Sequence, residues 1–171
     1  GLVGSEMCIR DSHNPDTWVL TDGKQMEADE IIDRFLRNAS FYRTGGITAT
    51  GGEPMLQIDF LTELFAKAKA HGIHTCLDTS GIMFPGFPED GEATSDITLE
   101  KIDRLLDVTD LVMLDIKHIR DEDHRKLTGH SNKNILAFAR YLDQKKKPVW
   151  IRHVVVPGIT FEEAELTELG H

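Results

Sequence analysis

Short runs of β-branched and apolar residues alternate with longer segments of helical periodicity from residue 27 onwards. In the helical segments apolar residues recur at i, i+3 and i+4, the spacing of one helix face, as Ile31, Ile32 and Phe35 show. Strands that alternate with helices favour right-handed βαβ units, and such units build a parallel sheet that helices cover. This alternation therefore predicts the α/β class.

The boundaries of the segments follow from turn residues and from the change of period. The predicted strands cover 47–50, 73–79, 111–116 and 149–156, and the predicted helices cover 27–42, 54–71, 99–106, 134–144 and 161–169. The segment 84–98 combines prolines and glycines with several acids, so it is predicted to be a solvated loop. Four strands cannot close an eight-stranded barrel, so we expect an open sheet or an incomplete barrel.

Polar and charged residues follow the predicted strands, at the edge where parallel α/β folds bind ligands. The four strand ends read Thr50-Gly51-Gly52-Glu53, Asp78-Thr79-Ser80, Asp115-Ile116-Lys117 and Arg152-His153. Acids and bases that gather at one rim predict a site for a polar small molecule. The alternative is structural: these side chains cap neighbouring helices and pair with one another.

Two features of this rim indicate what kind of ligand it would take. The Gly51-Gly52 turn lets the backbone approach closely, and exposed N–H groups there suit a carboxylate or a phosphate. Asp115 and Lys117 lie on one strand face, because alternate side chains point the same way. Such a pair either clamps a zwitterion, with Asp115 on the ammonium and Lys117 on the carboxylate, or forms an internal salt bridge.

The composition argues against several classes of protein. The chain of 171 residues has 19 Lys and Arg against 29 Asp and Glu, a net charge of −10, which disfavours a general nucleic-acid binder. No apolar run approaches the roughly 20 residues of a membrane helix, so no membrane segment is expected. The two cysteines, Cys8 and Cys76, are too few for a disulfide framework, so a reducing compartment, the cytoplasm, is expected. Cys76 lies within a predicted strand and is interpreted as a small core residue.

The chain has eight histidines, but none stands in an H-E-x-x-H or Cys/His knuckle spacing. The sequence therefore predicts no metal site built from them. The following histidines are interpreted as solvated surface residues: His71, His74, His118, His124 and His130.

Several longer motifs carry a family resemblance. Residues 46–54, Gly-Ile-Thr-Ala-Thr-Gly-Gly-Glu-Pro, resemble the GGE motif of radical S-adenosylmethionine enzymes. Within that superfamily, residues 74–81, 109–117 and 149–158 resemble the pyruvate formate-lyase activating enzymes, with the sequences HTCLDTSG, TDLVMLDIK and VWIRHVVVPG. Residues 13–18, HNPDTW, resemble the segment that follows the cluster loop of that family.

The resemblance implies a fold and a chemistry. The fold is a partial (β/α) barrel, of which this chain would be incomplete at both ends. Family members hold a [4Fe-4S] cluster through three cysteines of a C-x-x-x-C-x-x-C loop, and S-adenosylmethionine chelates the fourth iron. One electron then cleaves the cofactor to a 5′-deoxyadenosyl radical, which takes a hydrogen from a glycine of pyruvate formate-lyase. A flavodoxin is the implied electron donor.

The resemblance also implies which residues bind the cofactor. Carried over by position they are His13, Gly51, Gly52, Glu53, Asp78, Asp115, Ile116, Lys117 and Arg152. The Gly-Gly-Glu turn would contact the methionine end, where Glu53 would accept a hydrogen bond from the ammonium group. The charged residues that end the second and third strands would line the same site, with Arg152 nearby. His13 matches the residue directly after the last cluster cysteine.

The chain departs from the family at the cluster loop. If His13 follows the third cysteine, cysteines are required at positions that Ser5, Ile9 and Ser12 occupy, and these side chains cannot replace thiolates on iron. Residues 1–12 are therefore interpreted as a non-native leader, and 13–171 as the central part of a single domain.

From this departure we expect the chain as written to be inactive in radical formation, and we assign it no catalytic residue. Two alternatives remain. One is a non-catalytic module that binds a small molecule or a partner on the same fold, and the other is an activase of a different glycyl-radical enzyme.

Overall fold

The computed structural model describes residues 25–41, 45–87, 97–155, 160 and 163–170. Its strands form one parallel sheet in the order β1-β2-β3-β4, so neighbours in the sheet are also neighbours in the sequence. The strands are β1 (Gly46–Ala49), β2 (His74–Thr79), β3 (Leu111–Asp115) and β4 (Val149–Arg152). The α/β class and the parallel sheet are thus confirmed.

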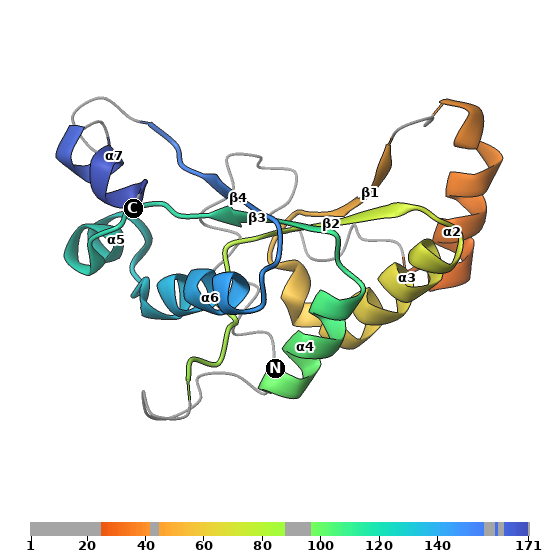
Figure 1. The fold of residues 1–171 in the computed structure, drawn as a ribbon, viewed down its shortest axis with the longest axis horizontal. Helices are drawn as coiled ribbons and strands as arrows, with labels where there is room; N and C mark the ends of the chain where they lie inside the picture. Colours follow the sequence, from red (N-terminus) through yellow and green to blue (C-terminus); the bar gives the residue numbers. More distant parts are fainter. Residues whose placement is uncertain (1–24, 42–44, 88–96, 156–159, 161–162, 171) are drawn as a thin grey trace.

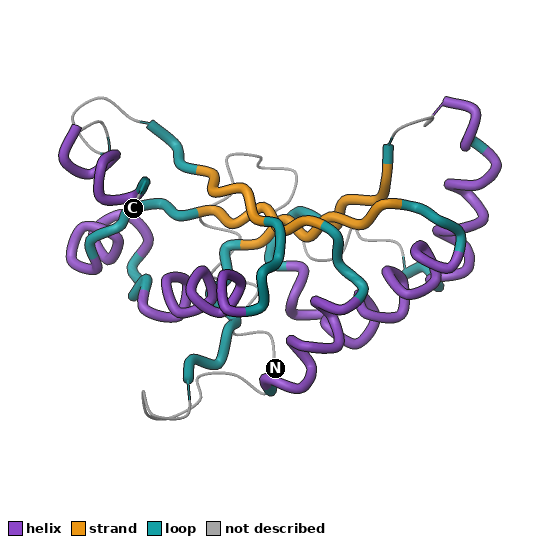
Figure 2. The backbone as a smooth tube through the Cα atoms, in the orientation of Figure 1, coloured by secondary structure: helices purple, strands orange, loops and turns teal. Residues whose placement is uncertain are grey.

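Most of the helices connect successive strands, and the longer ones between strands lie along one side of the sheet (Figure 1). The helices are α2 (Ala28–Arg37), α3 (Ile58–Ala70), α4 (Leu99–Asp107), α5 (Asp121–Thr128), α6 (Lys133–Gln144) and α7 (Glu163–Leu169), with short 3-10 turns η2 (Ala39–Phe41) and η3 (Pro54–Gln57). Figures 1 and 2 show the strands crossing the middle of the molecule, with α3, α4 and α6 along the same side of the sheet. Crossovers of one hand between successive strands place helices on one face in this way.

The core lies between the sheet and these helices. On β3, Val112 and Leu114 are buried and join the apolar cluster that contains Phe138 of α6. Because side chains alternate across a strand, Met113 and Asp115 project to the opposite face. The sheet thus keeps an apolar face for the helices and presents the charged end of β3 away from them.

Most predicted boundaries agree with the structure within two residues, and two segments end clearly earlier than predicted. The helix predicted over 27–42 ends at Arg37, where Asn38 caps it and η2 follows. The strand predicted over 149–156 ends at Arg152, because β3 offers its last pairing residue at Asp115. Part of each predicted segment, 42 and 156, lies outside the described residues.

The prediction of a solvated loop over 84–98 is wrong at its beginning. Phe84 is fully buried, with its ring centroid 5.3 Å from that of Phe138 and 5.2 Å from that of Tyr141. Ile97 is also buried, while 88–96 lies outside the described residues. Prolines and glycines marked the irregular backbone correctly, but irregular backbone can still carry a core side chain.

The sequence interpretation also missed a helix, α5. Its segment DEDHRKLT contains almost no apolar residue, so it lacks the periodicity that revealed the other helices. Charge and capping stabilise it instead: Asp121, Glu122 and Asp123 lie in its first turn, and Gly129 ends it with a φ of 79°.

Candidate functional site

The ends of β2, β3 and β4 bring two carboxylates and one guanidinium together. Arg152 donates from Nη1 to Asp78 Oδ2 at 2.9 Å, and its Nη2 lies 2.8 Å from Asp78 Oδ1. The same Nη2 lies 3.5 Å from Asp115 Oδ2. Sheet register explains this meeting, because Arg152 pairs with Asp115 across the last two strands. The two-pronged contact holds the buried Asp78 carboxylate in one orientation.

Asp115 is shared between Arg152 and Lys117. Lys117 Nζ lies 2.9 Å from Asp115 Oδ2, so the internal salt bridge that the sequence left open is formed. The other carboxylate oxygen, Oδ1, is buried and has no hydrogen-bond partner among the described residues. A buried acceptor without a donor is costly, so this oxygen marks a place where a ligand donor fits.

Glu53, which the resemblance expects to bind the cofactor, is buried and hydrogen-bonded within the chain. It is 4% exposed, and its two carboxylate oxygens accept four hydrogen bonds. Oε1 accepts from Met55 N–H at 3.1 Å and from the Thr79 hydroxyl at 2.6 Å. Oε2 accepts from the N–H and the hydroxyl of Ser80, at 3.1 and 2.6 Å. The carboxylate therefore ties the glycine turn to the end of β2, and these bonds assign it a supporting role.

The glycine turn itself has the geometry that the sequence suggested. Gly51 and Gly52 have φ values of 84° and 46°, a left-handed conformation that other residues rarely adopt. Just before them, Thr50 donates from Oγ1 to Asp78 Oδ2 at 3.0 Å. The turn is thereby attached to the charged cluster, with its backbone facing the same space.

These groups line one cavity of about 200 Å³, which gives room for a polar organic fragment rather than for a single water or ion. The lining consists of Thr50, Gly51, Gly52, Asp78, Thr79, Ser80, Ile82, Asp115, Lys117, His124, Thr128, His130, Ile135 and Arg152. Six of the nine residues expected to bind the cofactor are in this set. The strand-end rim, as predicted from the topology, is therefore one continuous surface.

Three of the expected residues are not in that lining. Glu53 is buried and bonded to Met55, Thr79 and Ser80, as described above. The Ile116 side chain is buried in the core, and its N–H donates to the Arg152 carbonyl at 2.9 Å. His13 lies outside the described residues.

The interpretation of the histidines as solvated is confirmed for some and wrong for others. His71 and His74 are exposed. His118 and His124 are 4% and 2% exposed, and His124 lines the cavity. Because the interpretation missed α5, it also missed the burial of His124. The only sequence signal was the glycine turn after it, which ends a helix.

The described residues give no support for a metal centre. Among them, no group of three or more His, Cys, Asp or Glu side chains is placed to hold a metal ion. Cys76 is buried within β2, as expected for a core residue, and burial raises the pKa of its thiol. A raised pKa disfavours the thiolate that binds iron.

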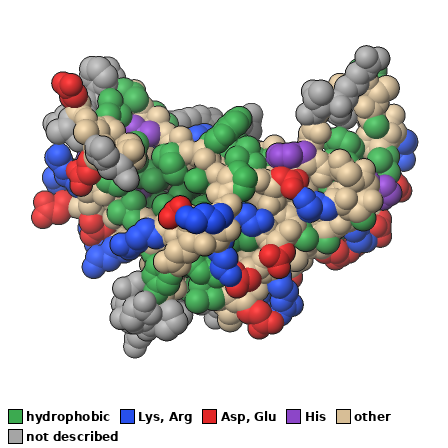
Figure 3. All heavy atoms as spheres, viewed as in Figure 1, with side chains coloured by type: hydrophobic (Ala, Val, Ile, Leu, Met, Phe, Trp, Pro, Cys, Tyr) green, Lys and Arg blue, Asp and Glu red, His purple; other side chains and the backbone are tan. Residues whose placement is uncertain are grey.

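On the face drawn in Figure 3, acidic and basic side chains of the described residues are interspersed. None of the helices in the described part of the chain has the length and apolar character needed to cross a membrane.

Comparisons with known proteins agree with this picture. A family model, that of the Radical SAM superfamily, matches residues 6–169. A pyruvate formate-lyase-activating enzyme of Streptococcus mutans is 48% identical over 172 aligned residues, which cover 99% of this chain and 62% of that protein. The same enzyme of Listeria monocytogenes is 45% identical, with 92% of this chain and 61% of that protein covered.

The chain thus spans about three-fifths of the length of these curated relatives. A solved domain of a pyruvate-formate lyase-activating enzyme from Bacteroides vulgatus resembles this fold, with a TM-score of 0.60 and 24% identity, over 73% of this chain and 69% of that one. With its parallel sheet, its charged strand-end rim and a family match across nearly its whole length, this chain belongs to the radical S-adenosylmethionine superfamily.

Proposed function

We propose that the strand-end cavity binds S-adenosylmethionine, and that the intact protein activates a glycyl-radical enzyme, pyruvate formate-lyase. The superfamily membership and the names of the relatives support the class of chemistry. A flavodoxin-type electron donor and a cytoplasmic location belong to the same proposal, by resemblance.

The observation that carries the cofactor assignment is the buried, unpartnered Oδ1 of Asp115. It would accept from the ammonium group of the methionine end, while Lys117 would attract the carboxylate. Gly51 and Gly52 would offer backbone groups beside them, and Arg152 would hold the Asp78 carboxylate in place. When bound, S-adenosylmethionine supplies the 5′-deoxyadenosyl group that the family uses to abstract hydrogen.

The cluster does not fit the residues of this chain. A C-x-x-x-C-x-x-C loop needs three thiolates, and the chain has two cysteines, of which Cys76 is buried in β2. The chain as written is expected to bind the cofactor without cleaving it.

Calorimetric titration with S-adenosylmethionine, without iron, tests the binding part of the proposal. Asp115→Asn replaces one carboxylate oxygen by a donor amide, so it should weaken binding about tenfold or more, since a hydrogen bond to a charged group contributes about 1.5–3 kcal/mol. Asp143→Asn, on the exposed side of α6, is the matched control and should bind like the wild type. If the wild type shows no binding, or Asp115→Asn binds equally well, the cofactor assignment is wrong.

Reconstitution with iron, sulfide and reductant under anaerobic conditions tests the chemistry. The wild-type chain should yield no 5′-deoxyadenosine, and its appearance would contradict the proposal. A triple variant, Ser5→Cys, Ile9→Cys and Ser12→Cys, restores the family spacing. It should show the electron paramagnetic resonance signal of a reduced cluster, and that signal should change when S-adenosylmethionine is added.

A further inference from the structure

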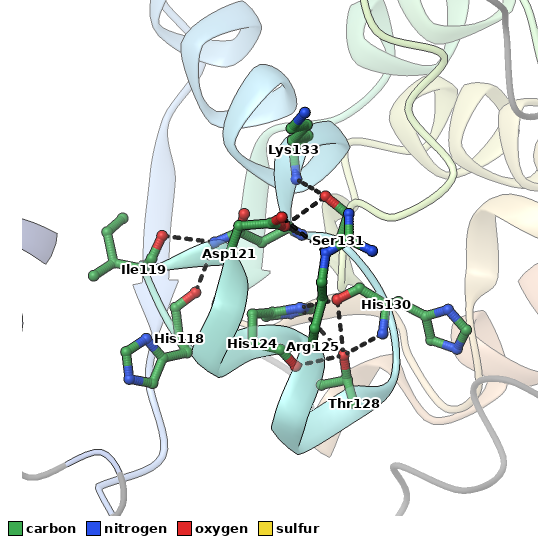
Figure 4. A network of polar contacts seen from close by, with 10 residues as sticks. His118, Ile119, Asp121, His124, Arg125, Thr128, His130, Ser131 and Lys133 are labelled. Atoms are coloured by element: carbon green, nitrogen blue, oxygen red, sulfur yellow. Dashed lines mark hydrogen bonds and ion pairs between the residues drawn. The ribbon is translucent and has the colours of Figure 1, made fainter.

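A buried histidine on α5 lines the cavity, and one of its ring nitrogens already has a hydrogen-bond partner within the chain. His124 is 2% exposed, and its Nδ1 lies 2.8 Å from the carbonyl oxygen of His130 (Figure 4). A carbonyl oxygen only accepts hydrogen bonds, so Nδ1 carries the proton and donates it. In the neutral ring Nε2 is then left without a proton, as a hydrogen-bond acceptor.

The turn that sets this tautomer is firmly held. Asp121 Oδ1 accepts from the Ser131 hydroxyl at 2.5 Å and from the Asn132 N–H at 3.0 Å. Asn132 in turn donates from Nδ2 to the carbonyls of His118 and Ile119, at 3.0 and 2.6 Å. These bonds, drawn in Figure 4, fix the segment after α5 against the segment before it. The carbonyl that orients the His124 ring is thus itself fixed in position.

Thr128 completes the support without competing for Nε2. Its Oγ1 donates to the His124 carbonyl at 3.0 Å and accepts from the His130 N–H at 3.2 Å. Nε2 of His124 is buried and has no hydrogen-bond partner among the described residues. Two residues that line the cavity, His124 and Asp115, thus each have a buried acceptor that lacks a donor among the described residues, Nε2 and Oδ1 respectively.

The chemistry of the two acceptors separates their ligands. An ammonium group binds more strongly to the carboxylates of Asp78 and Asp115 than to a neutral imidazole. A carboxylate group would be repelled by the lone pair of that imidazole. In a molecule with an amino-acid end and a nucleoside end, the remaining O–H donors are the hydroxyls of the sugar. A hydroxyl is both donor and acceptor, so it suits an imidazole nitrogen that only accepts.

We propose that His124 Nε2 accepts a hydrogen bond from a ribose hydroxyl of the bound nucleoside, which makes α5 the side of the cavity that recognises the nucleoside half of the ligand. This inference rests on the proposed function, because it takes the cavity to be the S-adenosylmethionine site. It adds a binding residue on an element outside the strand ends.

A matched pair of variants separates binding from structural support. His124→Asn places an amide N–H near the position of Nδ1, so it can keep the bond to the His130 carbonyl while it removes the acceptor at Nε2. His124→Gln reaches the position of Nε2 with its amide and loses the donor to that carbonyl. The measurements are thermal unfolding, and calorimetric titration with adenosine and with methionine as separate probes.

We expect His124→Asn to melt within a few degrees of the wild type and to bind adenosine at least about fivefold more weakly, with methionine binding unchanged. We expect His124→Gln to melt at a clearly lower temperature, because it releases the turn after α5. Wild-type binding of 2′-deoxyadenosine or 3′-deoxyadenosine should be weaker than that of adenosine. His124→Asn should bind adenosine and whichever deoxyadenosine the wild type binds more weakly with equal affinity.

Two results would overturn the inference while leaving the proposed function intact. Either S-adenosylmethionine binds the wild type and His124→Asn with equal affinity, or His124→Asn weakens the binding of methionine rather than that of adenosine. If the wild type binds neither S-adenosylmethionine nor adenosine, the proposed function fails as well.

Should His124→Asn not fold, nitrogen NMR of the wild-type imidazole decides the matter. A shift confined to the Nε2 resonance on addition of adenosine supports the inference, and an unchanged resonance at saturation refutes it.

Discussion

Replacement of Glu53 by glutamine tests the supporting role that the structure gives this residue. The carboxylate accepts from two backbone N–H groups and two hydroxyls. An amide keeps one oxygen, which can accept two of the four bonds. Its NH₂ group would face the other two donors, of which the Ser80 hydroxyl can rotate and accept, whereas the Ser80 N–H cannot.

One buried N–H is therefore left without an acceptor, at a cost of about 1–3 kcal/mol. We expect Glu53→Gln to lower the free energy of unfolding by about 2 kcal/mol, which for a chain of this length lowers the melting temperature by roughly 4–8 °C. Urea unfolding followed by circular dichroism measures the first quantity, and calorimetry measures the second.

The control is Glu63→Gln on α3, which removes an exposed ion pair of 3.0 Å with Lys67 and should cost less than about 0.5 kcal/mol. If Glu53→Gln unfolds like the wild type but binds S-adenosylmethionine more weakly, Glu53 contacts the ligand and the supporting role is refuted.

Three further variants test the core, a turn and the segment around α5. Phe84→Ala should lower the free energy of unfolding, measured with urea, by about 3–5 kcal/mol, because a fully buried ring is lost. A loss below about 1 kcal/mol would instead support the prediction that this segment is a solvated loop. Gly81→Ala should lower the melting temperature more than Gly72→Ala. Both have positive φ, but only at Gly81 would a Cβ meet core side chains, Leu114 at 2.9 Å; equal losses would contradict this packing. Hydrogen bonds from Ser131 and Arg125 hold the pKa of Asp121 well below its usual value. The stability that ionised Asp121 contributes is therefore complete above about pH 4, the pKa of an unfolded aspartate, and is lost as the pH falls below it. The stability difference between wild type and Asp121→Asn should narrow below that pH in unfolding curves, and a constant difference would refute the assignment.

Much of the architecture could be predicted from the sequence because strands and helices differ in period. Buried strands such as 111–116 have continuous apolar runs, and amphipathic helices such as α4 repeat every three to four residues. The prediction of α5 failed because its stability comes from charge and from its glycine cap, which leave no apolar period. Phe84 was misjudged for a related reason, since its neighbours are typical of a loop while its ring belongs to the core.

The site divides in the same way. The order of residues along the chain is enough to place acids, bases and glycines at the ends of the parallel strands, and in a parallel sheet all these ends meet at one edge. Which of these side chains bind one another became clear only from the folded chain: Glu53 accepts hydrogen bonds from Ser80, and Arg152 reaches across β3 to Asp78. The folded chain also decided that His124, from a polar helix, is buried beside them with one nitrogen that has no partner among the described residues. The physical reason is that a pattern along the chain records the average environment of an element, whereas hydrogen-bond partners depend on contacts between residues far apart in the sequence.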